Sequence, residues 1–438
     1  MSDAYKNKVD YRPFTILGDQ EGLPVITRVC PREDGFEFEW IDTGDRNNEQ
    51  ATVRLTYDRI SWEEIAVNGR LVDVKGRRDR LAEFTLETPD GRVSRRVRVQ
   101  CAKYPGLSVV NYLHPDDNRY DFSGSYLCSP SIIRNKKGEL LVSMDLFERE
   151  KPTFLTVLCK STDDGKTWRY VCDIAPMYWG SLFSHNDKLY ILGVTTGCCQ
   201  LTLAESEDDG NTWRSVLIGP RGFGSVKGNG PHKAPVRVER CAGRLWISVE
   251  WGSWLKQGFF AGAFSVSEDE DIMNPDNWKG TGFLPHPDGG RVASIEGSVI
   301  ETFDGRLVDF LRRSENKAHI VELDKNNPEK QPVHDRFIEC PFAHTKFQIE
   351  KYEGKYYAVG NECPHRNKLA VYVSDDLLCW REHKVVEDFS HLPPNHVGLQ
   401  YPSFIIENGE ALIVSRTAIN GADNFHNANC VTFHRIKL

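Results

Sequence analysis

The chain has 438 residues, of which 63 are acidic and 55 basic, giving a net charge of −8 at pH 7 and an isoelectric point of about 5.9. No basic run is visible, so a nucleic-acid partner is not expected. No stretch approaches the roughly 18 apolar residues of a membrane span, so no membrane partner is expected. The first residues lack the apolar core of a secretory signal, which favours a cytoplasmic location.

Cysteine spacing and metal motifs give no sign of a cofactor. The twelve cysteines are scattered without a C-x-x-C pair, and many lie in predicted strands. Buried free thiols are therefore favoured over disulfides. No H-E-x-x-H or EF-hand spacing occurs, so neither a metal nor another cofactor is predicted.

The first hundred residues contain short strands but no repeat. Apolar and polar residues alternate in Phe36–Trp40, Ala51–Tyr57 and Ser94–Gln100, and Gly-containing turns separate such runs. No long helical periodicity occurs anywhere, so the fold class is all-β. We predict that residues 1–104 form a small β-sandwich of immunoglobulin or fibronectin type III character.

A hairpin pattern recurs six times in residues 105–438. In each unit, a polar turn follows one apolar run, such as 234–238, and precedes another. The turns begin at Gly138, Asp187, Gly243, Gly305, Gly354 and Gly409. This spacing predicts a six-bladed β-propeller with four strands in each blade. The last unit lacks an outer strand, and we expect residues 107–113 to complete it and close the ring.

One octapeptide occurs in two of these units. It is S-T-D-D-G-K-T-W at Ser161–Trp168 and S-E-D-D-G-N-T-W at Ser206–Trp213, and six of its eight positions are identical. Ser and Asp can bond turn backbone, Gly supplies positive φ, and Trp buries a large face. We predict a turn between the third and fourth strands of a blade. The octapeptide resembles the Asp-box, or BNR repeat, of the sialidase superfamily, which is structural and lies away from the active face.

Strand alternation predicts where a functional site would lie. The loop entering the first strand of a blade and the loop after its second strand share one face, opposite the octapeptide turns. Ionisable side chains are dense in these loops, which indicates a site for a polar substrate. The candidates are Asp145, His232, Lys233, Glu250, Glu296, Arg312, Lys346, Arg366, Tyr401, Arg416 and His426.

The resemblance implies roles for some of these candidates. The segment Ile295–Arg312 is similar to the fourth-blade signature of sialidases, in which a Glu opens the blade and an Arg ends its second strand; Glu296 and Arg312 fit these positions. Q-Y-P-S-F-I-I is similar to the start of the sixth blade, which places Tyr401 as the nucleophile. The resemblance then implies that Glu296 accepts the tyrosine proton and that Arg312 and Arg366 bind a substrate carboxylate.

Two features depart from the family pattern. The family has an Arg before the first-blade strand, where this chain has L-C-S-P from Leu127. The family's acid/base Asp lies on the loop after the second strand of that blade, where Asp145 or Glu148 could substitute. Additional basic residues point to a different acidic or neutral glycan; they are His232, Lys233, Lys346 and His426.

These observations predict an exo-acting, sialidase-like glycoside hydrolase that acts on an acidic or terminal sugar of an oligosaccharide. Tyr401, Glu296 and Asp145 are its predicted catalytic residues, and the other candidates are predicted to bind substrate. A polysaccharide lyase that cleaves uronate glycans by β-elimination is one alternative, with Tyr401 or a His as base. A non-catalytic glycan-binding propeller is the other.

Overall fold

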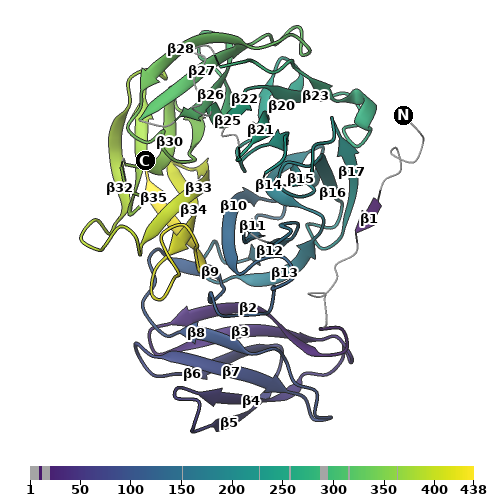
Figure 1. The fold of residues 1–438 in the computed structure, drawn as a ribbon, viewed down its shortest axis with the longest axis vertical. Coiled ribbons are helices and arrows are strands. Elements are labelled where there is room, and N and C mark those ends of the chain that lie inside the picture. The colour runs from purple at the N-terminus through teal and green to yellow at the C-terminus, as the bar shows by residue number, and fades with distance from the viewer. Residues whose placement is uncertain are drawn as a thin grey trace.

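In the structure, a computed structural model, nearly all regular secondary structure consists of β-strands (Figure 1). It describes residues 9–11, 20–149, 151–225, 227–255, 258–286, 294–313, 316–362 and 364–438. The short 3-10 helix η2 spans Pro275–Asn277. In these described ranges, no helix has the length and apolarity needed to cross a membrane.

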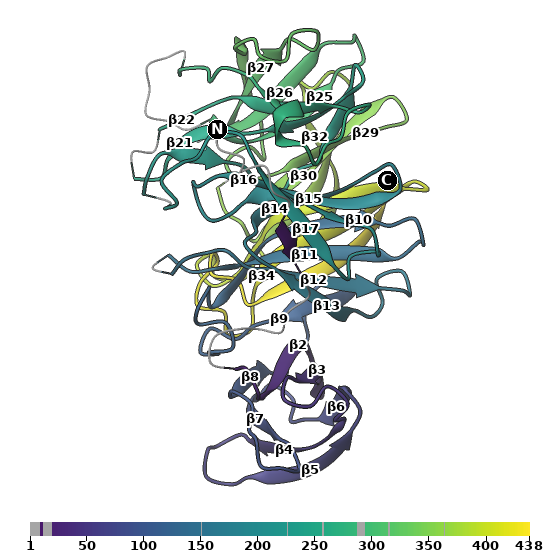
Figure 2. The same ribbon diagram turned by 90° about the vertical axis from the view of Figure 1, so that its right-hand side faces the viewer.

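Two antiparallel sheets built from residues 24–100 form a separate lobe, which we call the N-terminal lobe (Figures 1 and 2). One comprises β2 (Pro24–Arg32), β3 (Gly35–Asp42) and β6 (Leu71–Lys75); the other comprises β5 (Glu63–Asn68), β4 (Gln50–Thr56), β7 (Leu81–Glu87) and β8 (Val97–Gln100). Phe36 stacks on Phe84 in the core between them, beside Trp40. The three strands predicted in this region correspond to β3, β4 and β8.

Six antiparallel sheets of four strands each follow along the chain and surround a common centre (Figure 1). We call them the first to sixth blades. The first blade comprises β10 (Tyr126–Arg134), β11 (Leu140–Phe147), β12 (Thr156–Ser161) and β13 (Arg169–Ile174); the second comprises β14 (Tyr178–His185), β15 (Lys188–Val194), β16 (Leu201–Ser206) and β17 (Trp213–Ile218); the third comprises β19 (Glu239–Cys241), β20 (Arg244–Ser248), β23 (Ala263–Ser267) and β24 (Lys279–Gly280). The fourth comprises β25 (Ser294–Glu301), β26 (Leu307–Arg313), β27 (Lys317–Leu323) and β28 (Val333–Glu339); the fifth comprises β29 (Gln348–Tyr352), β30 (Lys355–Asn361), β31 (Lys368–Ser374) and β32 (Arg381–Asp388); the sixth comprises β33 (Gly398–Glu407), β34 (Glu410–Ala418), β35 (Cys430–Lys437) and β9 (Ser108–Tyr112). The first strand β10 contacts both β14 and β33, so the ring is closed.

The ring closes with a strand from the opposite end of the sequence. Strand β9 precedes the first blade but pairs with β35, with Tyr112 opposite Cys430. This confirms the expectation that residues 107–113 complete the last unit. Another early strand, β1 (Val9–Tyr11), pairs with β17 and extends the second blade by one strand (Figure 2). Both pairings cover strand edges that would otherwise be open.

The third blade departs from the predicted hairpin. Residues 234–238 were expected to form a strand, but they form none, because Pro235 has no N–H to donate to a ladder. The inner strand is instead divided into β19 and β18 (Gly230–His232). Strand β18 belongs to a small separate sheet with β21 (Glu250–Ser253) and β22 (Gly258–Phe260).

The repeated octapeptide forms the predicted turn in both copies, joining β12 to β13 and β16 to β17. In the first copy, Ser161 Oγ accepts the Gly165 amide at 2.8 Å, and Asp163 accepts the Thr167 amide at 2.8 Å. The second copy repeats these contacts with the corresponding residues. Trp168 is fully buried. The turns are therefore held by their own side chains and by packing.

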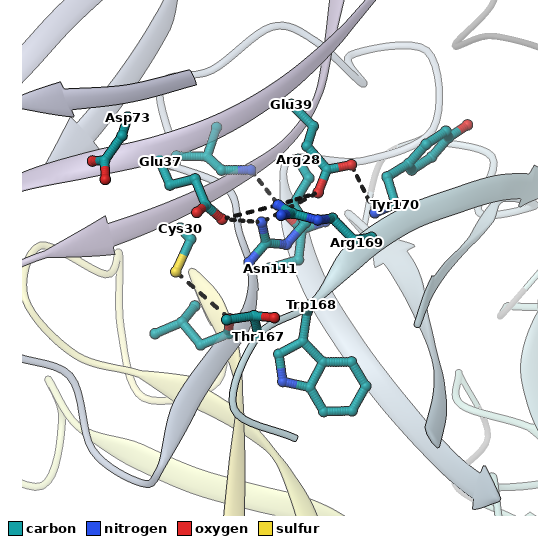
Figure 3. Close-up of polar contacts among 12 residues, drawn as sticks. Arg28, Cys30, Glu37, Glu39, Asp73, Asn111, Thr167, Trp168, Arg169 and Tyr170 are labelled. Atoms are coloured by element: carbon teal, nitrogen blue, oxygen red, sulfur yellow. Dashed lines mark hydrogen bonds and ion pairs between the residues drawn. The ribbon is translucent and has the colours of Figure 1, made fainter. Parts of the chain in front are cut away.

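A buried arginine joins the N-terminal lobe to the closing strand (Figure 3). Arg28 of β2 donates from Nε to the Val110 carbonyl of β9 at 2.8 Å. Its Nη1 donates to Glu37 at 2.9 Å and lies 3.5 Å from Glu39. Glu39 in turn accepts the Tyr170 amide of the first blade at 3.0 Å. The lobe and the ring therefore share one buried polar network.

We expect Arg28→Met to lower the free energy of unfolding by about 3 kcal/mol, because it leaves two largely buried carboxylates without their nearest buried cation. Urea titration followed by tryptophan fluorescence measures this loss. Arg54→Met is the matched control, since Arg54 is half-exposed and its ion pair with Glu64 contributes little. Equal stability of the two variants would contradict the prediction.

Candidate functional site

The innermost strand of four blades bulges at the same place. One residue in each has positive φ, between 45° and 56°; these residues are Ser129, Trp179, Glu296 and Tyr401. Pairing with the second strand shifts register at each of them. A bulge re-aims its side chain and leaves nearby backbone groups unpaired. Four inner strands thus depart from regular alternation near one end.

Hydrogen bonds between blades identify the corresponding positions elsewhere. The serine two residues after a bulge accepts a backbone N–H from the next blade. The donor is the residue that lies three positions after the bulge position of that next blade. The amide of Leu182 donates to Ser131, that of Val236 to Ser181, and that of Ile349 to Ser298. By this register, Lys233 and Lys346 hold the bulge positions of the third and fifth blades. All six blades therefore contribute one residue to a ring of equivalent positions.

Tyr401 and Glu296 are in direct contact, although they belong to different blades. The Tyr401 hydroxyl donates to Glu296 Oε1 at 2.7 Å, and Arg312 Nη1 donates to Glu296 Oε2 at 2.6 Å. Arg312 also lies 3.4 Å from the tyrosine hydroxyl. All three side chains were predicted to converge, and the structure brings them together.

The charges around this pair fix its protonation. Burial raises the pKa of the Tyr401 phenol above its ordinary value, and Glu296 adds to the rise. Burial also raises the pKa of Glu296, but Arg312 and then His232 more than offset it, so this pKa lies below its ordinary value. At neutral pH, the pair is therefore a neutral phenol beside a carboxylate that can accept its proton.

Two further guanidiniums flank the tyrosine ring. Arg416 lies 5.3 Å and Arg366 lies 5.9 Å from its centroid. Arg366 donates to the Gln400 side-chain oxygen, and Arg416 donates to the backbone carbonyl of His426. Among the described residues, neither guanidinium has a carboxylate within ion-pair distance.

Both of these cations keep their charge next to neutral partners. Burial lowers the pKa of Arg366 to about 10, which still leaves it charged at pH 7. Burial and the neighbouring Arg416 lower the pKa of His426 to about 2, so that imidazole is neutral. Arg416 Nε is buried and has no hydrogen-bond partner among the residues that the structure describes. The site therefore has a surplus of buried positive charge, which an anionic ligand would neutralise.

A histidine–carboxylate pair stands in the third blade. His232 Nδ1 lies 2.7 Å from Glu250 Oε2, and both residues are buried. The other oxygen of Glu250 accepts the amide of Gly297, the residue after Glu296, at 3.1 Å. Trp179 packs edge-on against the His232 ring at 4.5 Å. The pair is thus tied to the backbone of the Glu296 bulge.

Three predicted site residues have a task different from the predicted one. Asp145 accepts the Trp179 amide at 2.9 Å with one oxygen and the Thr156 hydroxyl at 2.5 Å with the other. Lys233 donates to the Trp179 carbonyl at 2.6 Å, and Lys346 donates to the Pro402 carbonyl. These buried charges satisfy backbone groups that the bulges leave unpaired, rather than facing a ligand.

The bulge at Trp179 has a signal in the sequence, which it shares with the other three bulges. The four bulges have the common pattern of any residue followed by Gly or Pro and then Ser: S-P-S, W-G-S, E-G-S and Y-P-S at residues 129, 179, 296 and 401. Gly or Pro after the bulge residue suits a broken ladder. The Ser bonds the next blade in three cases, whereas Ser403 donates to Gln348 of the preceding blade. The third and fifth blades lack the pattern and carry the two buried lysines instead.

No group of three or more His, Cys, Asp or Glu side chains suited to a metal ion occurs among the described residues. The eleven cysteines in that part of the chain are free thiols, and most are buried.

Comparisons with known proteins identify the fold. No protein-family model matches the chain, and no curated protein matches its sequence. Similar solved structures include a Hadza microbial sialidase (14% identity, TM-score 0.53, covering 99% of this chain and 95% of that one) and the leech intramolecular trans-sialidase (10%, 0.51, 98% and 93%). The α-L-arabinanase of Penicillium chrysogenum is another (13%, 0.52, 75% and 97%). The chain has the propeller fold that these proteins share.

The buried carboxyl of Asp145 should make stability depend on pH. Burial raises its pKa to about 7, so the folded chain keeps a proton that the unfolded chain loses from about pH 4 upward. Its contribution to stability therefore falls as pH rises from about 4 to 7. Asn can replace it, because Thr156 Oγ1 lies 3.1 Å from the Met177 carbonyl, to which it can donate instead.

We expect Asp145→Asn to match the wild type near pH 5 and to exceed its free energy of unfolding at pH 8. Urea titrations at both pH values measure the difference. The exposed Asp375→Asn is the matched control and should leave the pH dependence unchanged. A constant loss of stability in Asp145→Asn at both pH values would refute the assignment.

Proposed function

We propose that this protein is a glycoside hydrolase for a sugar that carries a carboxylate, with Tyr401 as nucleophile and Glu296 as its base. The observation that carries this proposal is a pair of guanidiniums, the partly buried Arg366 and the buried Arg416, that flank the Tyr401 ring without a carboxylate partner among the described residues. Solved structures with this fold include sialidases, an arabinanase and an arabinofuranosidase, which supports a glycosidase.

The proposed chemistry follows from the charges. A substrate carboxylate binds the guanidiniums, which replaces the missing anion of the site. The reacting carbon then lies next to that carboxylate, and a neutral phenol approaches it with less repulsion than an anionic nucleophile. As the Tyr401 oxygen bonds to this carbon, its proton passes over 2.7 Å to Glu296. Arg312 touches both groups and holds them in register.

Arg416 supplies the guanidinium that the first blade lacks. It comes from β34 of the sixth blade, and it lies 5.5 Å over the ring of Phe147 at the end of β11. Its charge also acts on Cys128, whose pKa burial raises to about 12. Cys128 lies in the first-blade motif where the family pattern has its arginine. The third cation of the proposed site is thus provided from the neighbouring blade.

The finer features of the proposal concern architecture and substrate. We assign the six sheets to a six-bladed propeller and the N-terminal lobe to an immunoglobulin-like or fibronectin-like sandwich. The enzyme would remove a terminal acidic sugar from an oligosaccharide, in the cytoplasm. A lyase is distinguished by its unsaturated product, which absorbs ultraviolet light. A binding protein would retain affinity and show no turnover.

We expect Tyr401→Phe to lower kcat at least about 10³-fold, because the nucleophile is lost while the carboxylate site stays intact. The assay is release of 4-nitrophenol from glycosides of N-acetylneuraminic acid and glucuronic acid, with the neutral L-arabinofuranoside as comparison. Tyr372→Phe is the matched control, since its buried hydroxyl has no hydrogen-bond partner among the described residues. Turnover of the neutral glycoside alone would contradict a carboxylated substrate.

Arg416→Met tests the carboxylate contact separately. Hydrogen bonds to a charged group are worth about 1.5–3 kcal/mol, so KM for the acidic glycoside should rise roughly 10- to 100-fold. Arg336→Met, an exposed arginine on the outer strand β28, is the control and should leave KM unchanged. An unchanged KM in Arg416→Met would show that this guanidinium does not bind the substrate.

A further inference from the structure

We propose that His232 is the acid/base catalyst of this site and that Glu250 is its positioning residue. The inference rests on the proposed hydrolase function, which needs a group to protonate the departing oxygen. Tyr401 and Glu296 already serve the nucleophilic half of the reaction, and the guanidiniums cannot give up a proton near pH 7. One further proton donor must therefore stand near the pair.

The imidazole is held in one orientation. Glu250 binds Nδ1 at 2.7 Å, and the ring nitrogens lie on opposite sides, so Nε2 is turned away from Glu250. Nε2 has no hydrogen-bond partner in the part of the chain that the structure describes. A carboxylate on Nδ1 fixes the tautomer, so Nε2 accepts a proton when the ring is neutral and donates one when it is charged.

The strand register places this pair at the same level as the arginines. Glu250 pairs with His232, as Arg312 pairs with Ile295 and Arg416 pairs with Gln400. Glu250, Arg312 and Arg416 thus each pair with the residue that comes directly before a bulge position. The side chains of Arg312 and Arg416 both reach Tyr401 from this position. The equivalent position of Glu250 therefore places His232 at the same end of the ring of blades.

One hydrogen bond links the histidine–glutamate pair to the reacting pair. Glu250 accepts the amide of Gly297, so it is bonded to the peptide that follows Glu296. The charge of His232 also contributes to lowering the pKa of Glu296. The histidine thus shares the electrostatic environment of the catalytic glutamate.

Aromatic rings surround the histidine on its other sides. Trp179 lies at 4.5 Å, Phe259 at 4.8 Å and Trp254 at 5.4 Å between ring centroids. Trp254 is partly exposed, whereas the other two are buried. Such rings restrict the imidazole and offer an apolar face to a leaving sugar. Asp145, by contrast, accepts hydrogen bonds from the Thr156 hydroxyl and the Trp179 amide with its two oxygens, which ties it to the support of the Trp179 bulge.

The proposed steps balance. Tyr401 oxygen bonds to the anomeric carbon and its proton goes to Glu296, while the glycosidic C–O bond breaks and His232 Nε2–H protonates the leaving oxygen. A water molecule then gives one proton to neutral His232 and bonds to the same carbon. The tyrosine–carbon bond breaks in this step, and Glu296 returns its proton to the phenolate oxygen.

Leaving-group dependence tests this role, because 2,4-dinitrophenolate departs without a proton and methanol does not. The substrates are the 2,4-dinitrophenyl and methyl glycosides of whichever acidic sugar in the panel above shows the highest turnover. We expect His232→Gln to lower kcat/KM for the methyl glycoside by about 10²–10³-fold. For the dinitrophenyl glycoside, kcat/KM should fall less than about tenfold, and added azide should raise kcat by replacing base-assisted water. Glu250→Gln should show the same pattern more weakly.

Other outcomes separate the failures. Equal losses on both glycosides in a folded His232→Gln protein, shown by an unchanged melting temperature, would overturn the role of His232. The same follows if Asp145→Asn, rather than His232→Gln, shows the leaving-group pattern and azide rescue. If the His232 variant unfolds, Glu250→Gln is used instead. A larger loss of kcat/KM on the methyl glycoside than on the dinitrophenyl glycoside would then support the proposal, and equal losses would overturn it. Absence of turnover by the wild type, or full activity of Tyr401→Phe, would instead reject the hydrolase itself.

Discussion

The central constraint of this molecule is the backbone bulge at the inner end of its blades. A bulky residue at positive φ costs about 1–3 kcal/mol and breaks the ladder beside it, so it persists only where the surroundings fix it. Here, buried ionisable side chains fix the bulges by hydrogen bonds to backbone. Asp145 accepts the Trp179 amide, Glu250 accepts the Gly297 amide, and Lys346 donates to the Pro402 carbonyl. These side chains therefore fix the backbone conformation of the bulges that carry the site.

This arrangement separates two classes of buried charge. The first class consists of side chains that form hydrogen bonds with backbone groups of the bulges. Burial raises the pKa of Asp145 to about 7 and lowers the pKa of Lys233 to about 7, so both shift toward their neutral forms. The arginines around Tyr401 stay charged, and their hydrogen-bond partners at Arg366 and Arg416 are neutral. A buried surplus of one sign is costly unless a ligand completes it. The anion site that we propose thus lies directly beside the proposed nucleophile, Tyr401.

The sequence predicted the fold better than the division of labour within the site. The octapeptide turns and the closing strand followed from local patterns, because turn chemistry and hairpin spacing are short-range. The convergence of Glu296, Arg312 and Tyr401 followed from strand alternation and the family resemblance. The support by Lys233 and Lys346 could not be predicted, because it depends on which carbonyl of a neighbouring blade each ammonium meets.

The contact between Glu296 and Tyr401 spans the fourth and sixth blades, so it depends on the whole ring remaining closed. Strand β9 provides the closure in the sixth blade, and Arg28 of the N-terminal lobe binds its Val110 carbonyl. Loosening of this lobe would free the closing strand and let the sixth blade move relative to the fourth. A shift of about 1 Å is enough to impair a catalytic geometry. The N-terminal lobe contributes none of the candidate residues, but it bonds the strand that closes the ring on which their geometry depends.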